Sequence, residues 1–206
     1  MMEKGLGIEK VSVGALIPIV DLAKWKAKWT IEKFIGDYKS REEATQKGAE
    51  LIEKLEFEGN LLLNEGINAM WTLICGGTET AFNNANARIG VGNGTAAAEA
   101  TQTGLQGAST AFKAMDSGYP SYGSNQKATF RSTFGSTEGN FAWEEITVDN
   151  GATPNKNLNR KVQAMGTKAS GKASLILMMP HNYVGSNARN NAILSLVPKR
   201  LRFRCQ

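Results

Sequence analysis

Residues 127–151 read KATFRSTFGSTEGNFAWEEITVDNG, and this stretch decides the fold class. Residues 127–134 alternate apolar or small side chains with polar ones, which is the period-two pattern of a strand with one buried face. Residues 135–140 predict a loop and residues 141–148 return as a second strand, so the stretch predicts an antiparallel hairpin. Asp149-Asn150-Gly151 then supplies residues that tolerate positive φ, as a turn requires.

Further strands are predicted on both sides of this hairpin, over residues 87–91, 158–165 and 173–179. In residues 24–33, KWKAKWTIEK, tryptophan, alanine and isoleucine share one parity. Interleaved Lys and Trp also occur where rings stack single-stranded nucleic acid. Strict alternation, however, separates the two kinds of side chain and favours a core stripe with a solvated back. We therefore expect a mainly β protein with an antiparallel β-sandwich or jelly-roll-like body.

Two helices are expected to pack on this body. Residues 40–43, SREE, have the spacing of a capping box, and apolar residues follow at helical intervals, which predicts a short helix over about 41–54. A second helix is predicted from Asn60, as N-cap, to Ile74, ending at Gly76-Gly77. Its apolar stripe requires a surface to lie on, and the sheet is the expected surface.

Residues 92–97, GNGTAA, match the pattern G-x-G-x-x-A of dinucleotide-binding loops. That fold needs repeated strand-helix-strand units and a parallel sheet, whereas hairpins follow here. Asp116 lies at about the distance of a ribose-binding acid, but it stands within MDSGYP (115–120), which predicts a turn. We expect no nucleotide, and expect the glycines to allow a sharp exit from the strand, with Asn93 and Gly94 at positive-φ positions.

The composition is that of an ordinary folded protein. The chain has 206 residues, enough for one large domain, with 41% hydrophobic and 21% charged residues. Cys75 and Cys205 lie far apart and form neither a metal-binding spacing nor a disulfide framework, so we expect assembly in a reducing, intracellular compartment. The apolar run at 11–20 contains Pro18 and is too short to span a bilayer, and no clean cleavage site follows; we expect neither a membrane span nor a signal peptide.

Charge is distributed unevenly along the chain. The net charge is +5, yet residues 151–206 contain basic residues and no acidic residue at all. Such a block can contact nucleic acid, or it can neutralise an acidic neighbour within the fold or on a partner. The basic residues are spaced out until the last eight positions, which favours the neutralising role.

The residues needed for catalysis are scarce. His181 is the single histidine, and no acid is positioned beside it for a triad. Glu144 and Glu145 are neighbours on a predicted strand and point to opposite faces, so they cannot work as a pair. No His/Cys/Asp cluster has metal-ligand spacing. We expect no enzyme activity, no catalytic residue, no cofactor and no transition metal, while an oxygen-ligand calcium site in the Asn- and Gly-rich loops stays open.

Several segments, taken in order, resemble a family of virion structural proteins from tailed bacteriophages, whose members are called tail-fibre, minor structural or head-associated proteins. The segments are FEGNLLLNEGINAMWTLICGG (57–77), FNNANARIGVGNGTAAAEATQTGLQGA (82–108), KAMDSGYPS (113–121), ATFRSTFGSTEGNFAWEEITVDNG (128–151) and LNRKVQAMGTKASG (158–171). The resemblance implies a non-enzymatic virion component, assembled in the host cytoplasm, that works by self-association and by packing against other virion proteins. It implies no small-molecule substrate and no membrane partner.

The resemblance covers residues 25–171 and leaves both ends outside it. We expect an N-terminal arm over 1–23, a β-rich structural domain over 24–179 in which the helix at 41–54 is an insertion, and a basic C-terminal tail over 180–206. Related chains close soon after the position of Gly171. The tail could be an arm that reaches a neighbouring subunit, a contact to packaged DNA, or the product of a reading-frame change.

Two alternative functions remain open from the sequence. A receptor- or glycan-binding module at the tail tip would use Tyr119 and Tyr122 as an exposed aromatic platform, although a buried role in the turn is favoured for both. A nucleic-acid-binding protein would use the basic final quarter, and its affinity would fall steeply with salt. The candidate contacts in the tail are Lys199, Arg200, Arg202 and Arg204.

Overall fold

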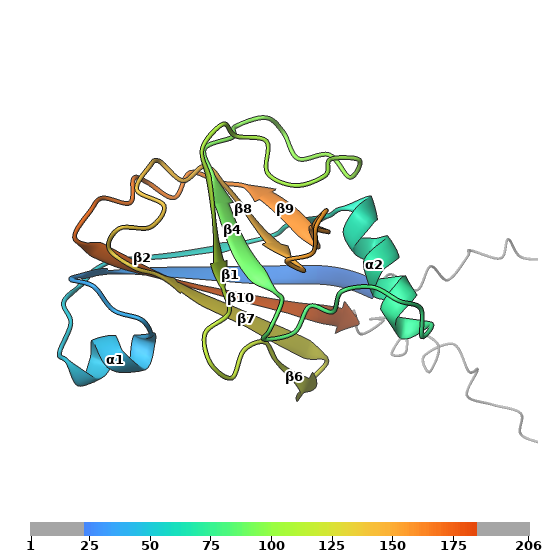
Figure 1. The fold of residues 1–206 in the computed structure, drawn as a ribbon, viewed down its shortest axis with the longest axis horizontal. Helices are drawn as coiled ribbons and strands as arrows, with labels where there is room; N and C mark the ends of the chain where they lie inside the picture. The colour runs from blue at the N-terminus through green and yellow to red at the C-terminus, as the bar shows by residue number, and fades with distance from the viewer. Residues whose placement is uncertain (1–22, 185–206) are drawn as a thin grey trace, which may run out of the picture. The chain divides into compact units, whose positions relative to one another are not determined.

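The computed structural model describes residues 23–184, of which residues 24–183 form one compact unit. The fold is mainly β, as expected: two antiparallel five-stranded sheets pack as a β-sandwich, with two helices beside them (Figure 1). One sheet has the strand order β2-β1-β10-β7-β6, and the other has the order β3-β9-β8-β4-β5. The elements are β1 (Ala23–Ile35), α1 (Arg41–Gln46), β2 (Leu51–Glu58), β3 (Leu61–Leu62), α2 (Asn64–Ile74), β4 (Arg88–Gly92), β5 (Thr110–Ala114), β6 (Ser121–Ser124), β7 (Lys127–Phe134), β8 (Glu145–Asp149), β9 (Asn159–Val162) and β10 (Lys172–Val184).

The hydrophobic core lies between the two sheets and is built by the alternation that the sequence predicts. Ala27, Trp29 and Ile31 of β1 are buried on one parity. Phe130 and Phe134 of β7 join them from the same sheet. The second sheet contributes Ile89, Val91, Ile146 and Val148. The Trp143 ring meets Phe134 edge to face, with centroids 5.2 Å apart, and closes one end of the core.

The predicted hairpin over 127–148 is wrong, although both of its strands exist. β7 pairs with β10 and β6, whereas β8 pairs with β4 and β9 in the other sheet. The segment between them carries the buried Trp143, whose backbone N–H donates to Gly166 O. Between β7 and β8 the chain therefore crosses from one sheet to the other, with the Trp143 indole buried on the way. No local turn joins the two strands.

The helix predicted over 41–54 is shorter than expected. Ser40 is the N-cap, as predicted, and its hydroxyl accepts from the Glu43 backbone N–H. The helix ends at Gln46, and Gly48 takes a φ of 63°, which suits glycine and turns the chain into β2. The apolar residues at 51, 52 and 55 therefore belong to a strand.

The second helix also begins later than predicted, because Leu63 and not Asn60 precedes it as N-cap. Leu63 is fully buried, and its N–H donates to Leu158 O. Gly66 lies against the backbone at the start of β9, where an added Cβ would stand 2.5 Å from Asn157 O and from Leu158 Cα. This close approach, together with Glu65 accepting from the Asn157 N–H, fixes α2 to the second sheet.

The back of β1 is not solvated along its whole length, contrary to expectation. Thr30 and Glu32 are buried on the outer face of the first sheet. Arg41 of α1 pairs with Glu32 at 2.8 Å, and Thr30 and Glu32 line a small cavity together with Arg41. β10 continues to Val184, beyond the expected end of the body at 179, while the expected arm over 1–23 lies almost wholly outside the described residues.

Candidate functional site

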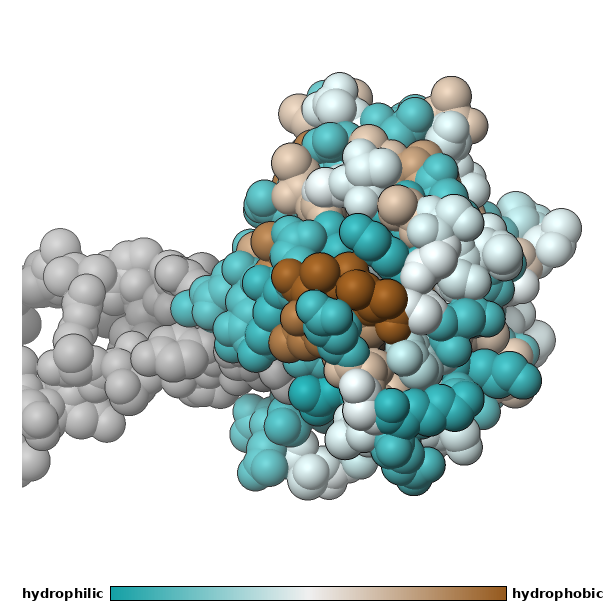
Figure 2. Space-filling view, turned by 90° about the vertical axis from the view of Figure 1, so that its left-hand side faces the viewer, coloured by the Kyte–Doolittle hydropathy of each residue, from teal (hydrophilic) through white to brown (hydrophobic). Residues whose placement is uncertain are grey.

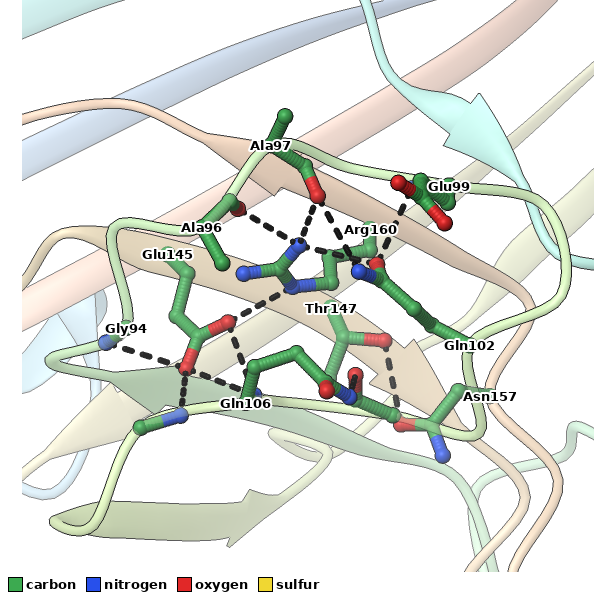
Figure 3. Close-up of polar contacts among 12 residues, drawn as sticks. Gly94, Ala96, Ala97, Glu99, Gln102, Gln106, Glu145, Thr147, Asn157 and Arg160 are labelled. Atoms are coloured by element: carbon green, nitrogen blue, oxygen red, sulfur yellow. Dashed lines mark hydrogen bonds and ion pairs between the residues drawn. The ribbon is translucent and has the colours of Figure 1, made fainter.

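The glycine-rich stretch becomes the long loop between β4 and β5, and a buried carboxylate holds it (Figure 3). Glu145 stands at the start of β8 and is fully buried. Its carboxylate accepts from three backbone N–H groups of this loop: Gly94 at 3.1 Å, Gln106 at 3.0 Å and Gly107 at 2.7 Å. Both ends of the loop are thereby drawn to one side chain.

Arg160 of β9 completes this centre. Its guanidinium is fully buried and pairs with Glu145 at 2.6 Å through Nε. Nη1 donates to the carbonyls of Ala96 and Ala97 and to the side-chain oxygen of Gln102, as Figure 3 shows. Within residues 23–184, Nη2 is buried without a hydrogen-bond partner. The pair therefore binds the middle of the loop as well as its two ends.

The glycines of the GNGTAA motif leave room for Glu145. A Cβ added at Gly92 or at Gly94 would stand 2.5 Å from Glu145 Oε1. A Cβ at Gly107 would likewise overlap the Gly94 nitrogen. The expectation that Asn93 and Gly94 take positive φ is wrong, because neither residue does so. The Gly94 N–H of this motif, which would face a phosphate in a dinucleotide loop, donates to the protein's own Glu145 carboxylate instead.

A second charged cluster lies on the outer face of the first sheet. Arg131 of β7 donates to Glu42 of α1 through both terminal nitrogens, at 2.7 and 2.8 Å, and to Asp116 through Nε at 3.0 Å. The same guanidinium lies 4.2 Å from the centre of the Tyr119 ring. Burial raises the pKa of Asp116, against the Thr133 hydroxyl and Arg131, which lower it. Arg131 thus ties α1 and the 116–120 turn to the sheet.

A cavity of about 90 Å³ lies beside this cluster, between Arg41, Tyr119, Arg131 and the sheet residues Thr30, Glu32 and Leu175. Pockets for small organic ligands measure about 300–1,000 Å³. The cavity has room for a few water molecules, and its charged lining is already paired within the protein.

The residues predicted to mediate interactions do not form one site. Tyr119 is half-buried beneath Arg131, so the predicted turn role describes it better than an aromatic platform. The buried role in the turn that is favoured for Tyr122 is wrong, because Tyr122 lies on the edge strand β6 and is 78% exposed. Lys199, Arg200, Arg202 and Arg204 lie outside the described residues, and their roles stay predictions.

Two basic residues of the final quarter, Arg160 and Lys168, bind acidic or polar neighbours within the fold. Arg160 binds Glu145, and the buried Lys168 donates to Asn140 at 2.8 Å. Burial lowers the pKa of Lys168, and Glu138 and Asp37 act in the opposite direction. His181 pairs through its backbone with Lys127. Among residues 23–184 no group of three or more His, Cys, Asp and Glu side chains is placed to hold a metal ion.

Among the described residues, exposed apolar side chains gather at the end of β1 with the start of β2, and on α2. Figure 2 shows a compact hydrophobic patch at the end of the molecule where β1 ends and β2 begins. The exposed large residues there are Ile35, Leu51 and Ile52, which the β1–β2 pairing brings together. At α2, Trp71 is 60% and Ile74 71% exposed, and Ile67 continues the same helical stripe. The prediction that this stripe packs on the sheet is therefore wrong for its second half; Gly66 and Ala69 are the helix residues buried against the body.

No helix among the described residues has the length and apolar character of a membrane-spanning helix. Comparison of the chain with protein families, curated proteins and solved structures returns no match. The similarity to virion proteins therefore stays a prediction from the sequence segments that carry it.

Proposed function

We propose that this chain is a non-enzymatic structural component of a tailed-phage virion, acting by self-association and by packing against neighbouring virion proteins. The observation that carries the proposal is the exposed apolar face of α2. The only charged residue of this helix, Glu65, turns to Asn157, so Trp71 and Ile74 lie on a helix face that carries no charged residue of its own. Contiguous apolar surface of this kind marks protein interaction sites.

The buried charges support a structural role over catalysis. Catalytic groups are kept reactive and in reach of a substrate. Glu145 and Arg160 are instead fully buried, and both are committed to the 93–109 loop. Arg131, Asp116 and Glu42 are likewise committed to one another. These groups stabilise the loops of the body and leave interaction to its surface.

The test is incorporation into particles. Phage encoding W71S/I74S is compared with phage encoding the wild-type chain, and purified particles are analysed by quantitative mass spectrometry. We expect the wild-type chain in the particles and at least a tenfold loss for the double variant, whose thermal unfolding should stay near wild type because both side chains are exposed. Absence of the wild-type chain from particles refutes the proposal.

Tyr122→Ser is the matched control, because it also removes a large exposed side chain but from β6. We expect normal incorporation of this variant. The exposure of Tyr122 is the one observation that favours the second candidate function, glycan or receptor binding. That function predicts binding on a glycan array that Y122S abolishes, whereas a purely structural component binds nothing there.

A further inference from the structure

β2 is an edge strand of the first sheet, and its outer side has no strand beside it within residues 23–184. The Gly59 N–H donates to Ala27 O at 2.8 Å, in register with the β1–β2 pairing. In an antiparallel ladder, residues alternate between pointing their N–H and C=O groups at the partner strand and away from it. The outward-pointing groups of β2 are consequently those of Lys54, Glu56 and Glu58.

The charges along β2 restrict how a second copy could pair with this edge. The strand reads LIEKLEFE over 51–58, and side chains directly opposite one another in an antiparallel pair lie on the same face. For two copies related by a twofold axis, a register centred on Glu53, Lys54 or Glu56 places that residue against its own copy, which is a like-charge contact. Of the registers that pair at least five residues of β2, only the one centred on Leu55 avoids like charges.

We propose that two copies of this chain associate through β2, antiparallel about a twofold axis at Leu55, so that their first sheets become one continuous sheet. Lys54 of each copy then lies opposite Glu56 of the other. The main-chain N–H and C=O groups of Lys54 and Glu56 point away from β1, so the two opposed residues also exchange main-chain hydrogen bonds between the copies. Leu55 faces its own copy on the core side, beside Phe57.

The ion pairs within each copy fit this arrangement. Glu56 already lies between Lys28 and Lys54, at 2.9 Å from each. Addition of the second copy's Lys54 and Glu56 extends this row with alternating sign, so no charge is left facing its like. This inference rests on the proposed function, because it names the partner and one surface of the proposed self-association.

The test uses two charge-reversal variants, alone and mixed. Lys54→Glu places two carboxylates opposite each other in its own dimer, and Glu56→Lys places two ammonium groups opposite each other. In a mixture of the two, the introduced carboxylate of one copy faces the introduced ammonium group of the other, and the unchanged Glu56 faces the unchanged Lys54. By sedimentation velocity of the full-length chain, we expect each variant alone to weaken dimerisation at least tenfold and the mixture to return to within about threefold of wild type.

A cysteine pair gives an independent readout of the register. In a C75S/C205S background, Leu55→Cys lies opposite itself at a non-hydrogen-bonded pair, where Cα atoms are about 4.5 Å apart and a disulfide can form. Glu53→Cys faces Phe57 of the other copy and is the control. We expect oxidative cross-linking of the L55C chain to a dimer and none of the E53C chain.

A mixture that associates as weakly as its separate components, or E53C cross-linking as readily as L55C, overturns the inference. A wild-type chain that sediments as a monomer at every concentration also overturns it. None of these three results decides the proposed function, which is judged by the presence of the chain in purified particles.

Discussion

Glu145→Gln is the substitution that tests the internal architecture most directly. The amide keeps the size of the carboxylate but removes its charge, so Arg160 is left buried without its counter-ion. One carboxylate oxygen, which accepts hydrogen bonds, becomes an NH₂ group, which can only donate them. This donor then faces the backbone N–H groups or the guanidinium that donate to Glu145 in the wild-type chain. Removal of one partner of a buried ion pair costs about 3–5 kcal/mol.

That loss is large on the scale of a domain, whose free energy of unfolding is typically about 5–15 kcal/mol. For a body of this size each kcal/mol lowers the melting temperature by about 2–4 °C, so we expect a fall of about 6–20 °C. Arg160→Met should cost less, because the Glu145 carboxylate keeps three backbone N–H donors. Both variants should also speed amide exchange throughout the 93–109 loop.

The assays are thermal and urea unfolding, each followed by tryptophan fluorescence, with hydrogen exchange on the native chain. Glu144→Gln is the matched control: it makes the same chemical change one residue earlier, at a half-buried position. We expect the control to remain within about 0.5 kcal/mol of wild type. If E145Q unfolds within about 1 kcal/mol of E144Q, or if the loop exchanges at the wild-type rate, the structural role assigned to Glu145 is refuted.

Three further predictions concern local packing and charge. Gly66→Ala should destabilise the chain by about 1–3 kcal/mol in thermal unfolding, although alanine has the higher helix propensity. The reason is that the alanine Cβ would meet backbone atoms of Asn157 and Leu158. A neutral or stabilising result would contradict the packing of α2. Ser40→Ala should cost about 1 kcal/mol in urea unfolding through loss of the cap on Glu43. Ser117→Ala, at an exposed position outside any helix, is the control and should stay near wild type. Hydrogen bonds from Lys54 and, to a smaller extent, Lys28 lower the pKa of Glu56 from 4.5 to about 2. The contribution of Glu56 to stability is therefore present above pH 4.5 and is lost as the pH falls towards 2. An NMR titration should show a higher Glu56 pKa in K54M, and an unchanged value would disprove the pairing.

The sequence predicts the strands well where alternation is long and regular. β1 and β7 each place the apolar residues of one parity in the core between the sheets, and the period-two pattern is sufficient to find both strands. It cannot identify the partner of a strand, because pairing depends on contacts distant in sequence; β7 and β8 therefore look like a hairpin although they lie in different sheets. Residues 51, 52 and 55 fit both a helix and a strand spacing, which explains the overlong helix predicted there.

The Glu145–Arg160 centre could not be predicted from local pattern. Glu145 and Arg160 are 15 positions apart in the sequence. The loop residues that they bind precede Glu145 by 38 positions or more. The available signal is the presence of charged residues in the short strands EITVD and NRKV, since a charge that is buried in a sheet needs a partner. That signal indicates a buried pair, but it does not identify the glycine-rich loop as the segment that the pair holds.

The backbone contact at Gly66 has a consequence for recognition. A helix held this closely by its own sheet has already lost its freedom to shift or unwind before any partner arrives. The indole of Trp71 is displayed from a rigid support, so in the proposed virion role docking on it would require little additional ordering of the main chain. Among many identical subunits, such a fixed geometry would give every copy the same contact at the same angle.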